Sequence, residues 1–292
     1  MDNNKYGMEI SRLAQQACIL EVCAPKPGNV NRNHDFPDSR FEDFLISALA
    51  IGPAFENAEQ WRVGQIIWHA TEETRRLVGS NTNLGIILLL APLAKACAGA
   101  AGPGEIRERV NAVLGSLDVE DARLSYRAIR LARPGGLGRM AEADIADEPS
   151  ITLLEAMRLA KERDSIAREY ADGFRITFEI GLPALQEALS SGAGFQNAIV
   201  HSYLSLLSRV PDTLIARKRD IQTAERVSSL AAVVLNAGGI FTPQGRTALA
   251  ELDCELRDPG HTLNPGTTAD LTTAAIFLAL TSSQFPVSSS QL

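Results

Sequence analysis

The stretch Asn264-Pro265-Gly266-Thr267-Thr268-Ala269-Asp270-Leu271 stands directly before an apolar run, Ala274 to Leu280, and together they predict a long helix. Pro265 suits the first helical turn, because an N–H at that position would have no partner inside the helix. The asparagine and the two threonines of the stretch carry side-chain oxygens that cap free amides. The sequence therefore predicts a well-defined helix start at this point.

Such a helix start presents free backbone amides, which form a ready site for an anion. The amides of Gly266, Thr267 and Thr268 predict a phosphate cradle, and Gly266 allows a ligand to approach the backbone closely. Asp270 lies in the same first turn, where a carboxylate suits the helix dipole but repels a phosphate. A Mg²⁺ ion between the two groups would reconcile them. The alternative is a plain capped helix with an acidic first turn.

Apolar residues recur with the helical period along most of the chain, and strand-like alternation is almost absent. The sequence therefore predicts an all-α protein, with a single domain of about a dozen helices over residues 1–292. No repeat, low-complexity tract or obvious linker divides it. The expected helices span residues 6–22, 39–55, 59–78, 84–98, 105–117, 119–132, 152–161, 164–180, 183–189, 195–208, 220–236, 243–256 and 265–282.

Composition excludes several classes of protein. The chain of 292 residues is 45% hydrophobic, enough to bury a substantial core. Its formal net charge is −7, and the densest basic run, residues 217–219, lies between aspartates, so we expect no nucleic-acid partner. The cysteines form no C-x-x-C pair, which argues against zinc ribbons and fits a reduced cytoplasmic compartment.

We expect neither a signal peptide nor a membrane span. Residues 1–9 are polar and lack the apolar core of a signal peptide. The most apolar segment, residues 84–94, is shorter than the roughly 20 residues that cross a bilayer. It therefore predicts a buried core helix of a soluble protein.

Five further motifs contain residues that could bind a ligand or take part in catalysis. The first, Pro25-Lys26-Pro27-Gly28-Asn29-Val30, follows Glu21. Each residue before a proline is held in an extended conformation, so Lys26 is expected to project from a stiff segment. A cation held stiffly near a carboxylate suits a polyphosphate bound with metal. The alternative is an ordinary rigid turn after a helix.

Two further motifs combine small and polar residues. Asn81-Thr82-Asn83-Leu84-Gly85 predicts a polar cap before a buried helix, and its glycine costs about 1 kcal/mol relative to alanine, which suggests close approach of a helix or ligand. Arg133-Pro134-Gly135-Gly136-Leu137-Gly138 allows amides to converge on an anion, or forms a flexible loop. It matches neither a G-x-x-x-x-G-K-[ST] loop nor a dinucleotide fingerprint.

The last two motifs carry charged and titratable groups. Pro211-Asp212-Thr213-Leu214-Ile215-Ala216-Arg217-Lys218 places one carboxylate and two cations within about two helical turns, which suits a phosphate with metal or a solvated helix start. Asp258-Pro259-Gly260-His261 contains the histidine best placed for proton transfer, with a structural role as the alternative. No Ser-His-Asp or H-E-x-x-H pattern is present.

Four of the motifs, by their order and spacing, resemble the triphosphoribosyl-dephospho-coenzyme A synthase family over most of the chain. They are Glu21-x-x-x-Pro-Lys-Pro-Gly-Asn-Val, Asn81-Thr82, Pro211-Asp212-Thr213 and the Pro-Gly-x-x-Ala-Asp-Leu box that ends at Leu271. The resemblance implies an all-α fold and transfer of the triphosphoribosyl part of ATP to a hydroxyl of 3′-dephospho-coenzyme A, with release of adenine. The product is the precursor of the prosthetic group of citrate lyase and malonate decarboxylase acyl carrier proteins.

Two motifs depart from the pattern of members linked to citrate lyase. Those members usually have G-V-N-T-H-K-G, where this chain has Asn83 and Leu84 in place of the histidine and lysine. They also have S-P-G-G-S-A-D, where this chain has Asn264-Pro265-Gly266-Thr267-Thr268-Ala269-Asp270. The chain is similar to a divergent branch found in archaea and methylotrophic bacteria, so the acceptor is open.

The resemblance implies an ATP-dependent transferase that uses Mg²⁺. We assign the site residues by their chemistry. Glu21 or Glu56 is expected to act as the base, His261 as the proton donor, and Asp212 and Asp270 as metal ligands. The residues expected to bind phosphate are Lys26, Asn81, Thr82, Arg217, Lys218, Gly266, Thr267 and Thr268. The expected partners are ATP and 3′-dephospho-coenzyme A or a related acceptor, and a homodimer is compatible with the sequence. The alternatives are transfer to an acceptor of pterin-dependent one-carbon metabolism and a non-catalytic helical nucleotide-binding protein.

Overall fold

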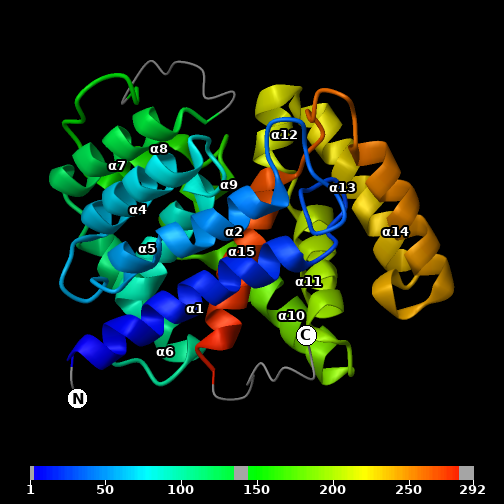
Figure 1. Ribbon diagram of the computed structural model, residues 1–292, viewed down its shortest axis with the longest axis horizontal. Coiled ribbons are helices and arrows are strands. Elements are labelled where there is room, and N and C mark those ends of the chain that lie inside the picture. The colour runs from blue at the N-terminus through cyan, green and yellow to red at the C-terminus, as the bar shows by residue number, and fades with distance from the viewer. Residues whose placement is uncertain (1–2, 135–143, 283–292) are drawn as a thin grey trace.

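The computed structural model describes residues 3–134 and 144–282, and these form helices joined by short loops (Figure 1). Within these ranges there is no β-strand, and only two isolated β-bridges occur, both in the loop after the first helix. The all-α prediction is therefore confirmed. The elements are α1 Asn3–Cys23, α2 Phe41–Ala50, α3 Gly52–Phe55, α4 Val63–Val78, α5 Leu84–Ala96, α6 Pro103–Gly115, α7 Val119–Ala132, α8 Leu153–Ala160, α9 Ser165–Ala171, the π-helix η1 Thr177–Gly181, α10 Leu182–Ser190, α11 Phe195–Arg209, α12 Thr213–Lys218, α13 Ile221–Asn236, the 3-10 helix η2 Gly239–Phe241, α14 Pro243–Leu256 and α15 Gly266–Leu280.

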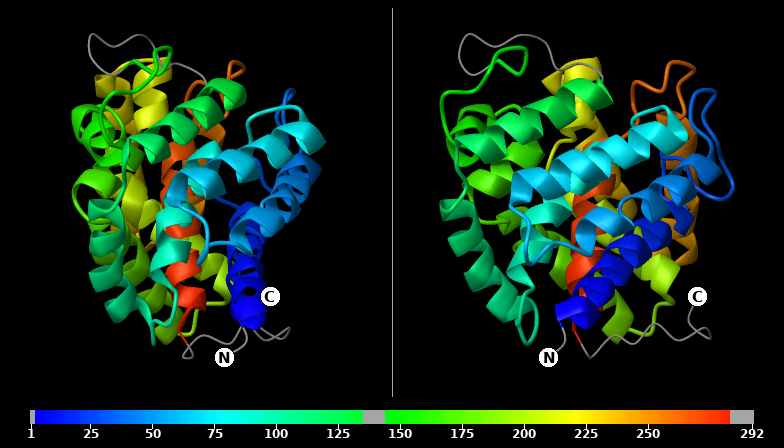
Figure 2. Two further views of the ribbon diagram at one scale, coloured as in Figure 1. Left: turned by 90° about the vertical axis from the view of Figure 1, so that its left-hand side faces the viewer. Right: turned by 60° about the vertical axis from the view of Figure 1, so that its left-hand side comes forward.

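Helix α15 runs through the interior, and α1, α5, α10 and α11 pack around it (Figures 1 and 2). Every side chain from Leu271 to Ala279 is buried, as expected for a helix that is apolar on all sides. The hydroxyls of Thr272 and Thr273 donate to carbonyls one turn back, so neither is left unpaired in the core. The stretch that precedes α15 is thereby fixed at the centre of the molecule.

Two predicted helices are interrupted. The helix expected over residues 39–55 is split at Ile51 into α2 and α3. The helix expected over residues 164–180 ends early, because Gly173 and Phe174 have φ values of 68° and 60°. Left-handed residues cannot continue a right-handed helix, and the chain resumes as η1.

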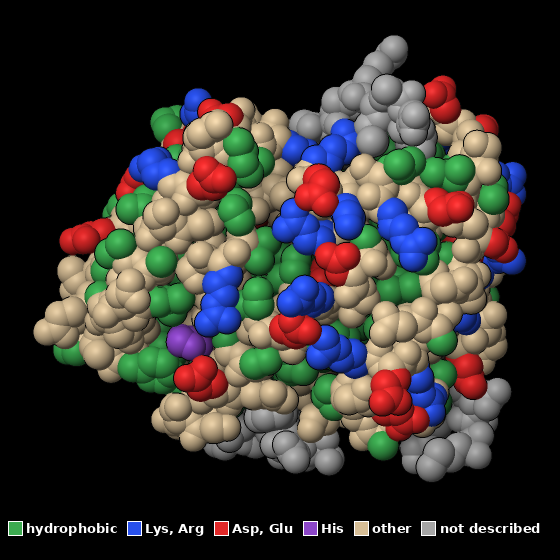
Figure 3. Space-filling view, turned by 180° about the vertical axis from the view of Figure 1, so that it is seen from behind, with side chains coloured by type: hydrophobic (Ala, Val, Ile, Leu, Met, Phe, Trp, Pro, Cys, Tyr) green, Lys and Arg blue, Asp and Glu red, His purple; other side chains and the backbone are tan. Residues whose placement is uncertain are grey.

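The surface seen from behind shows Lys and Arg interspersed with Asp and Glu rather than gathered by sign (Figure 3). None of the helices in the described ranges combines the length and the apolarity that a bilayer crossing requires. The expected homodimer stays a prediction.

Glu169 joins α9 to η1 from inside the core. Its side chain is fully buried and accepts hydrogen bonds from the amides of Ile176 and Thr177, at 2.8 and 2.7 Å, and from the Thr177 hydroxyl. Burial raises the pKa of Glu169 to about 7, although these hydrogen bonds oppose the shift. The folded protein therefore holds this proton over a pH range in which the unfolded chain has lost it.

We expect the free energy of unfolding to fall as the pH rises from 4.5 to about 7, because the raised pKa of Glu169 favours the folded state only while the group is protonated. Glu169→Gln should flatten this slope and lower stability, because an amide nitrogen cannot accept one of the three hydrogen bonds. Urea unfolding at several pH values measures both effects, with the exposed Glu108→Gln as control. An unchanged slope in Glu169→Gln would contradict the assignment.

Candidate active site

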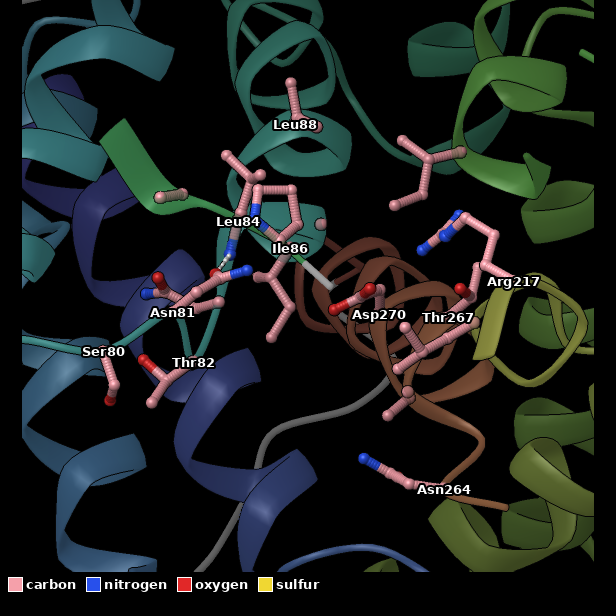
Figure 4. Close-up of a pocket in the computed structure, with 18 of the residues that line it drawn as sticks. Ser80, Asn81, Thr82, Leu84, Ile86, Leu88, Arg217, Asn264, Thr267 and Asp270 are labelled. Carbon is pink, nitrogen blue, oxygen red and sulfur yellow. Dashed lines mark hydrogen bonds between the residues drawn. The ribbon is translucent and has the colours of Figure 1, made fainter. Parts of the chain in front are cut away.

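A cavity of about 650 Å³ lies where the N-terminal end of α15 faces α5, α9 and α12 (Figure 4). This volume is within the range of small-molecule sites. Its wall carries both signs of charge among apolar side chains. The charged residues are Glu21, Asp38, Arg75, Arg133, Arg163, Asp164, Arg217, Lys218 and Asp270.

The carboxylate of Asp270 faces this cavity and makes no hydrogen bond or ion pair with any described residue. Burial, followed by the negative charges of Glu21, Asp212 and Asp164, raises the pKa of Asp270 well above its ordinary value. Arg217 opposes this shift but does not pair with the carboxylate. A bound cation would stabilise the ionised form, so Asp270 suits the metal role predicted for it.

Gly85 gives Asp270 the space that it occupies. A Cβ atom added to Gly85 would overlap Oδ2 of Asp270 and press against Ile166. The close approach predicted from this glycine is confirmed, and the approaching group is the Asp270 carboxylate.

Gly85→Ala is expected to lower turnover by about tenfold or more, because it displaces Asp270 from its position. Helical propensity favours alanine by about 1 kcal/mol, so α5 itself should remain intact. Steady-state kinetics and circular dichroism test the two parts. Gly115→Ala in α6 is the control, since no atom lies within 4 Å of its added Cβ. Normal turnover in Gly85→Ala would show that the exact position of Asp270 does not matter.

Asp212 has a different task from the one predicted. Its Oδ1 accepts from the amides of Leu214 and Ile215, at 2.8 and 3.1 Å, and caps α12. Its Oδ2 accepts from the amide and hydroxyl of Thr268, at 2.7 and 2.8 Å. Neither Asp212 nor Thr268 lines the cavity. The structure therefore corrects both assignments: Asp212 fills the anion position at α15 that was expected to hold a phosphate with Thr268.

The remainder of the predicted cradle does face the cavity. Gly266 and Thr267 line it, and the amide of Thr267 has no hydrogen-bond partner in the described ranges. The Thr267 hydroxyl accepts from Thr213 at 3.2 Å, which ties α15 to α12 a second time.

Lys26 is also placed differently from the prediction. Its side chain is fully buried and does not line the cavity. The ammonium group pairs with the Glu21 carboxylate at 2.9 Å and donates to the backbone carbonyls of Glu21 and Ala24. It thus caps the C-terminal end of α1. The structure corrects the expectation that Lys26 projects toward a phosphate, because its charge is already neutralised inside the protein.

Glu21 reaches the cavity wall from α1 with Lys26 behind it. Burial raises the pKa of Glu21, and the ion pair and hydrogen bond with Lys26 oppose the shift. Glu21 is therefore a carboxylate at the cavity whose protonation state a buried cation adjusts.

Arg217 and Lys218 both line the cavity from the last turn of α12. Arg217 donates from Nη1 to Oδ2 of Asp164 at 2.6 Å, while its Nε is buried without a partner in the described structure. Lys218 donates to the His261 carbonyl at 3.0 Å, and burial lowers the pKa of Lys218. Both cations line the cavity, and their role in binding phosphate stays a prediction.

His261 lies at the cavity wall with its ring stacked on Phe36, 4.0 Å between centroids. Its φ of 48° is uncommon for a residue other than glycine, asparagine or aspartate. Asp258 holds this turn by accepting from the amides of Gly260, Thr262 and Leu263. Both imidazole nitrogens are buried and lack a hydrogen-bond partner among described residues, which suits a ring that meets a ligand.

Comparison with known proteins identifies the family of this chain. The model of the ATP:dephospho-CoA triphosphoribosyl transferase family (CitG) matches residues 7–288. The chain belongs to this family. It is therefore a transferase by family, and the family resemblance stated from the sequence motifs is confirmed.

Relatives of this transferase share moderate identity over nearly its whole length. Proteins named "Probable 2-(5''-triphosphoribosyl)-3'-dephosphocoenzyme-A synthase" are 30% identical in Pseudomonas fluorescens Pf-5 and 34% identical in Pseudomonas savastanoi pv. phaseolicola. Each match covers 92% of this chain and 90% of the relative. A crystal structure from Archaeoglobus fulgidus, described as a triphosphoribosyl-dephospho-CoA synthase, is 34% identical, with a TM-score of 0.64 over 82% of this chain and 99% of that one.

Of the other predicted site residues, two line the cavity and one does not. Asn81 and Thr82 line the cavity; Asn81 accepts from the amide of Leu84 at 3.2 Å (Figure 4), and Thr82 bonds the Ser47 hydroxyl. Glu56 is exposed at the end of α3 and does not line the cavity, so the structure does not bring this candidate base to the site.

Sequence reasoning gave no site role to five charged residues at the cavity: Asp38, Arg75, Arg133, Arg163 and Asp164. Asp164 carried a detectable signal, since it caps α9, directly after an arginine. Arg133 begins the glycine-rich motif, but the glycines of that motif, residues 135–138, lie outside the described ranges.

Proposed function

We propose that this transferase moves the triphosphoribosyl group of ATP to a hydroxyl of 3′-dephospho-CoA and releases adenine, yielding a prosthetic-group precursor. The observation that carries the proposal is the unpaired Asp270 carboxylate in one cavity with Arg217 and Lys218, in a chain of this family. Cations and a free carboxylate together suit a polyphosphate with a divalent metal ion.

The phosphate end of the site is formed by α12 and α15. Arg217 and Lys218 bind triphosphate oxygens through charge-assisted hydrogen bonds, and the Thr267 amide adds a neutral donor. Asp270 would hold a Mg²⁺ ion through its free carboxylate oxygens, as a site shared with substrate phosphates requires. Bound Mg²⁺ would neutralise charge on the triphosphate.

The reaction forms one bond and breaks another at C1′ of the ribose. The acceptor hydroxyl oxygen attacks C1′ while the bond from C1′ to adenine breaks, through an oxocarbenium-like state. Glu21 accepts the proton of the hydroxyl, with Lys26 stabilising its ionised form beforehand. Adenine leaves with the electron pair of the broken bond and takes a proton donated by His261.

Chromatographic separation of the bases formed from Mg-ATP and 3′-dephospho-CoA tests this function. Acceptor-dependent free adenine is the expected product. ADP or AMP as the main acceptor-dependent product would contradict glycosyl transfer. Adenine release only with another acceptor, such as a pterin precursor, would keep the chemistry and replace the acceptor, whereas no release with any acceptor would favour a binding protein.

A further inference from the structure

Helix α9 lies between α12 and α15 on one side and α7 and α8 on the other (Figure 1), and residues of all five helices line the cavity. On the side formed by α7 and α8 the apolar residues Ile129, Met157 and Ala160 line the cavity. Neither α7 nor α8 contributes a carboxylate to its wall in the described ranges. The metal-binding chemistry of Asp270 is therefore confined to the side formed by α12 and α15.

Two arginines flank this apolar surface. Arg133 follows α7 and Arg163 precedes α9, and the side chain of neither makes a hydrogen bond or ion pair with a described residue. Arg133 has a φ of 50°, a conformation that costs free energy in a residue with a side chain. Arg217, in contrast, is already paired with Asp164. Arg133 and Arg163 are thus cations whose donors are free for an anionic ligand.

We propose that this side of the cavity is the acceptor subsite of the transferase. Arg133 and Arg163 bind the diphosphate of 3′-dephospho-CoA, and the surface of Ile129, Met157 and Ala160 packs against its pantetheine arm. This inference rests on the function proposed above, whose acceptor it locates.

The two substrates differ in the chemistry that each needs. The triphosphate of ATP is more highly charged and binds with a metal ion, which matches the side that holds Asp270. A diphosphate that bridges two organic groups carries less charge and is bound by arginine forks. Asp164, next to Arg163 in the chain, is already paired with Arg217. The methyl and methylene groups of the pantetheine arm gain by burying apolar surface, which Ile129, Met157 and Ala160 offer.

Calorimetric titration of 3′-dephospho-CoA into the intact protein tests the subsite. Arg133→Met and Arg163→Met should each weaken binding by about tenfold or more, the effect of a lost charge-assisted hydrogen bond. Mg-ATP should bind both variants within about twofold of wild type. Arg158→Met is the matched control, because Arg158 is exposed on α8 outside the cavity and should leave both affinities unchanged. Ala160→Leu fills the apolar side and should weaken 3′-dephospho-CoA alone.

The result separates this inference from the proposed function, because the titration needs no turnover. Wild-type protein that binds 3′-dephospho-CoA but releases no adenine would contradict the function and leave the subsite to be decided by the variants. Unchanged affinity in both arginine variants, loss of Mg-ATP binding in their place, or no binding of 3′-dephospho-CoA by wild type would each overturn the subsite.

Discussion

Asp270→Asn is expected to reduce acceptor-dependent adenine release by about 100-fold or more, with the fold intact. The amide keeps the shape of the side chain but removes the charge that would hold Mg²⁺ against the triphosphate. Stability should change little, because Asp270 lies beyond the first turn of α15 and its carboxylate pairs with no described residue, while the amide relieves repulsion from Glu21, Asp212 and Asp164. Adenine chromatography and thermal unfolding measure the two quantities.

Glu251→Gln on the exposed face of α14 is the control for Asp270→Asn, because it also neutralises one acid. A second readout is the Mg²⁺ concentration needed for ATP binding, which should rise in Asp270→Asn only. Wild-type turnover in Asp270→Asn would show that the unpaired carboxylate has no part in the reaction.

Lys26→Met should destabilise the protein by about 3–5 kcal/mol, the usual cost of removing one partner from a buried ion pair. The substitution leaves Glu21 inside the protein without its cation and the carbonyls at the end of α1 without their cap. Denaturant unfolding measures the loss. Lys26→Arg should not restore stability, since a planar guanidinium does not fit a fully buried site shaped for an ammonium group.

The double variant Lys26→Met with Glu21→Gln separates charge from packing. It should recover part of the stability lost in Lys26→Met, because no buried carboxylate then remains unpaired. A Lys26→Met variant as stable as wild type, with weakened ATP binding, would restore the original prediction that Lys26 contacts a phosphate.

The period of the apolar residues was sufficient to predict the helical fold. The unbroken apolar run of residues 274–280 also predicts that α15 is buried on every side. The position of Asp270 and the crowding at Gly85 were also accessible, because both depend on local sequence. Lys26 was wrongly placed because its flanking prolines restrict the backbone but do not determine the direction in which the side chain points. Asp212 was wrongly placed because its partner Thr268 lies 56 residues away, and no local pattern reports such a contact.

Asp212 accepts hydrogen bonds from the first turns of both α12 and α15 and so holds the two helix starts together. Arg217 and Lys218 stand on one of these helices and Asp270 on the other. Their relative placement is therefore settled when the chain folds. The groups that would bind a polyphosphate and its metal ion are therefore preorganised. The conformational entropy lost in bringing these protein groups together is lost on folding and does not weaken binding.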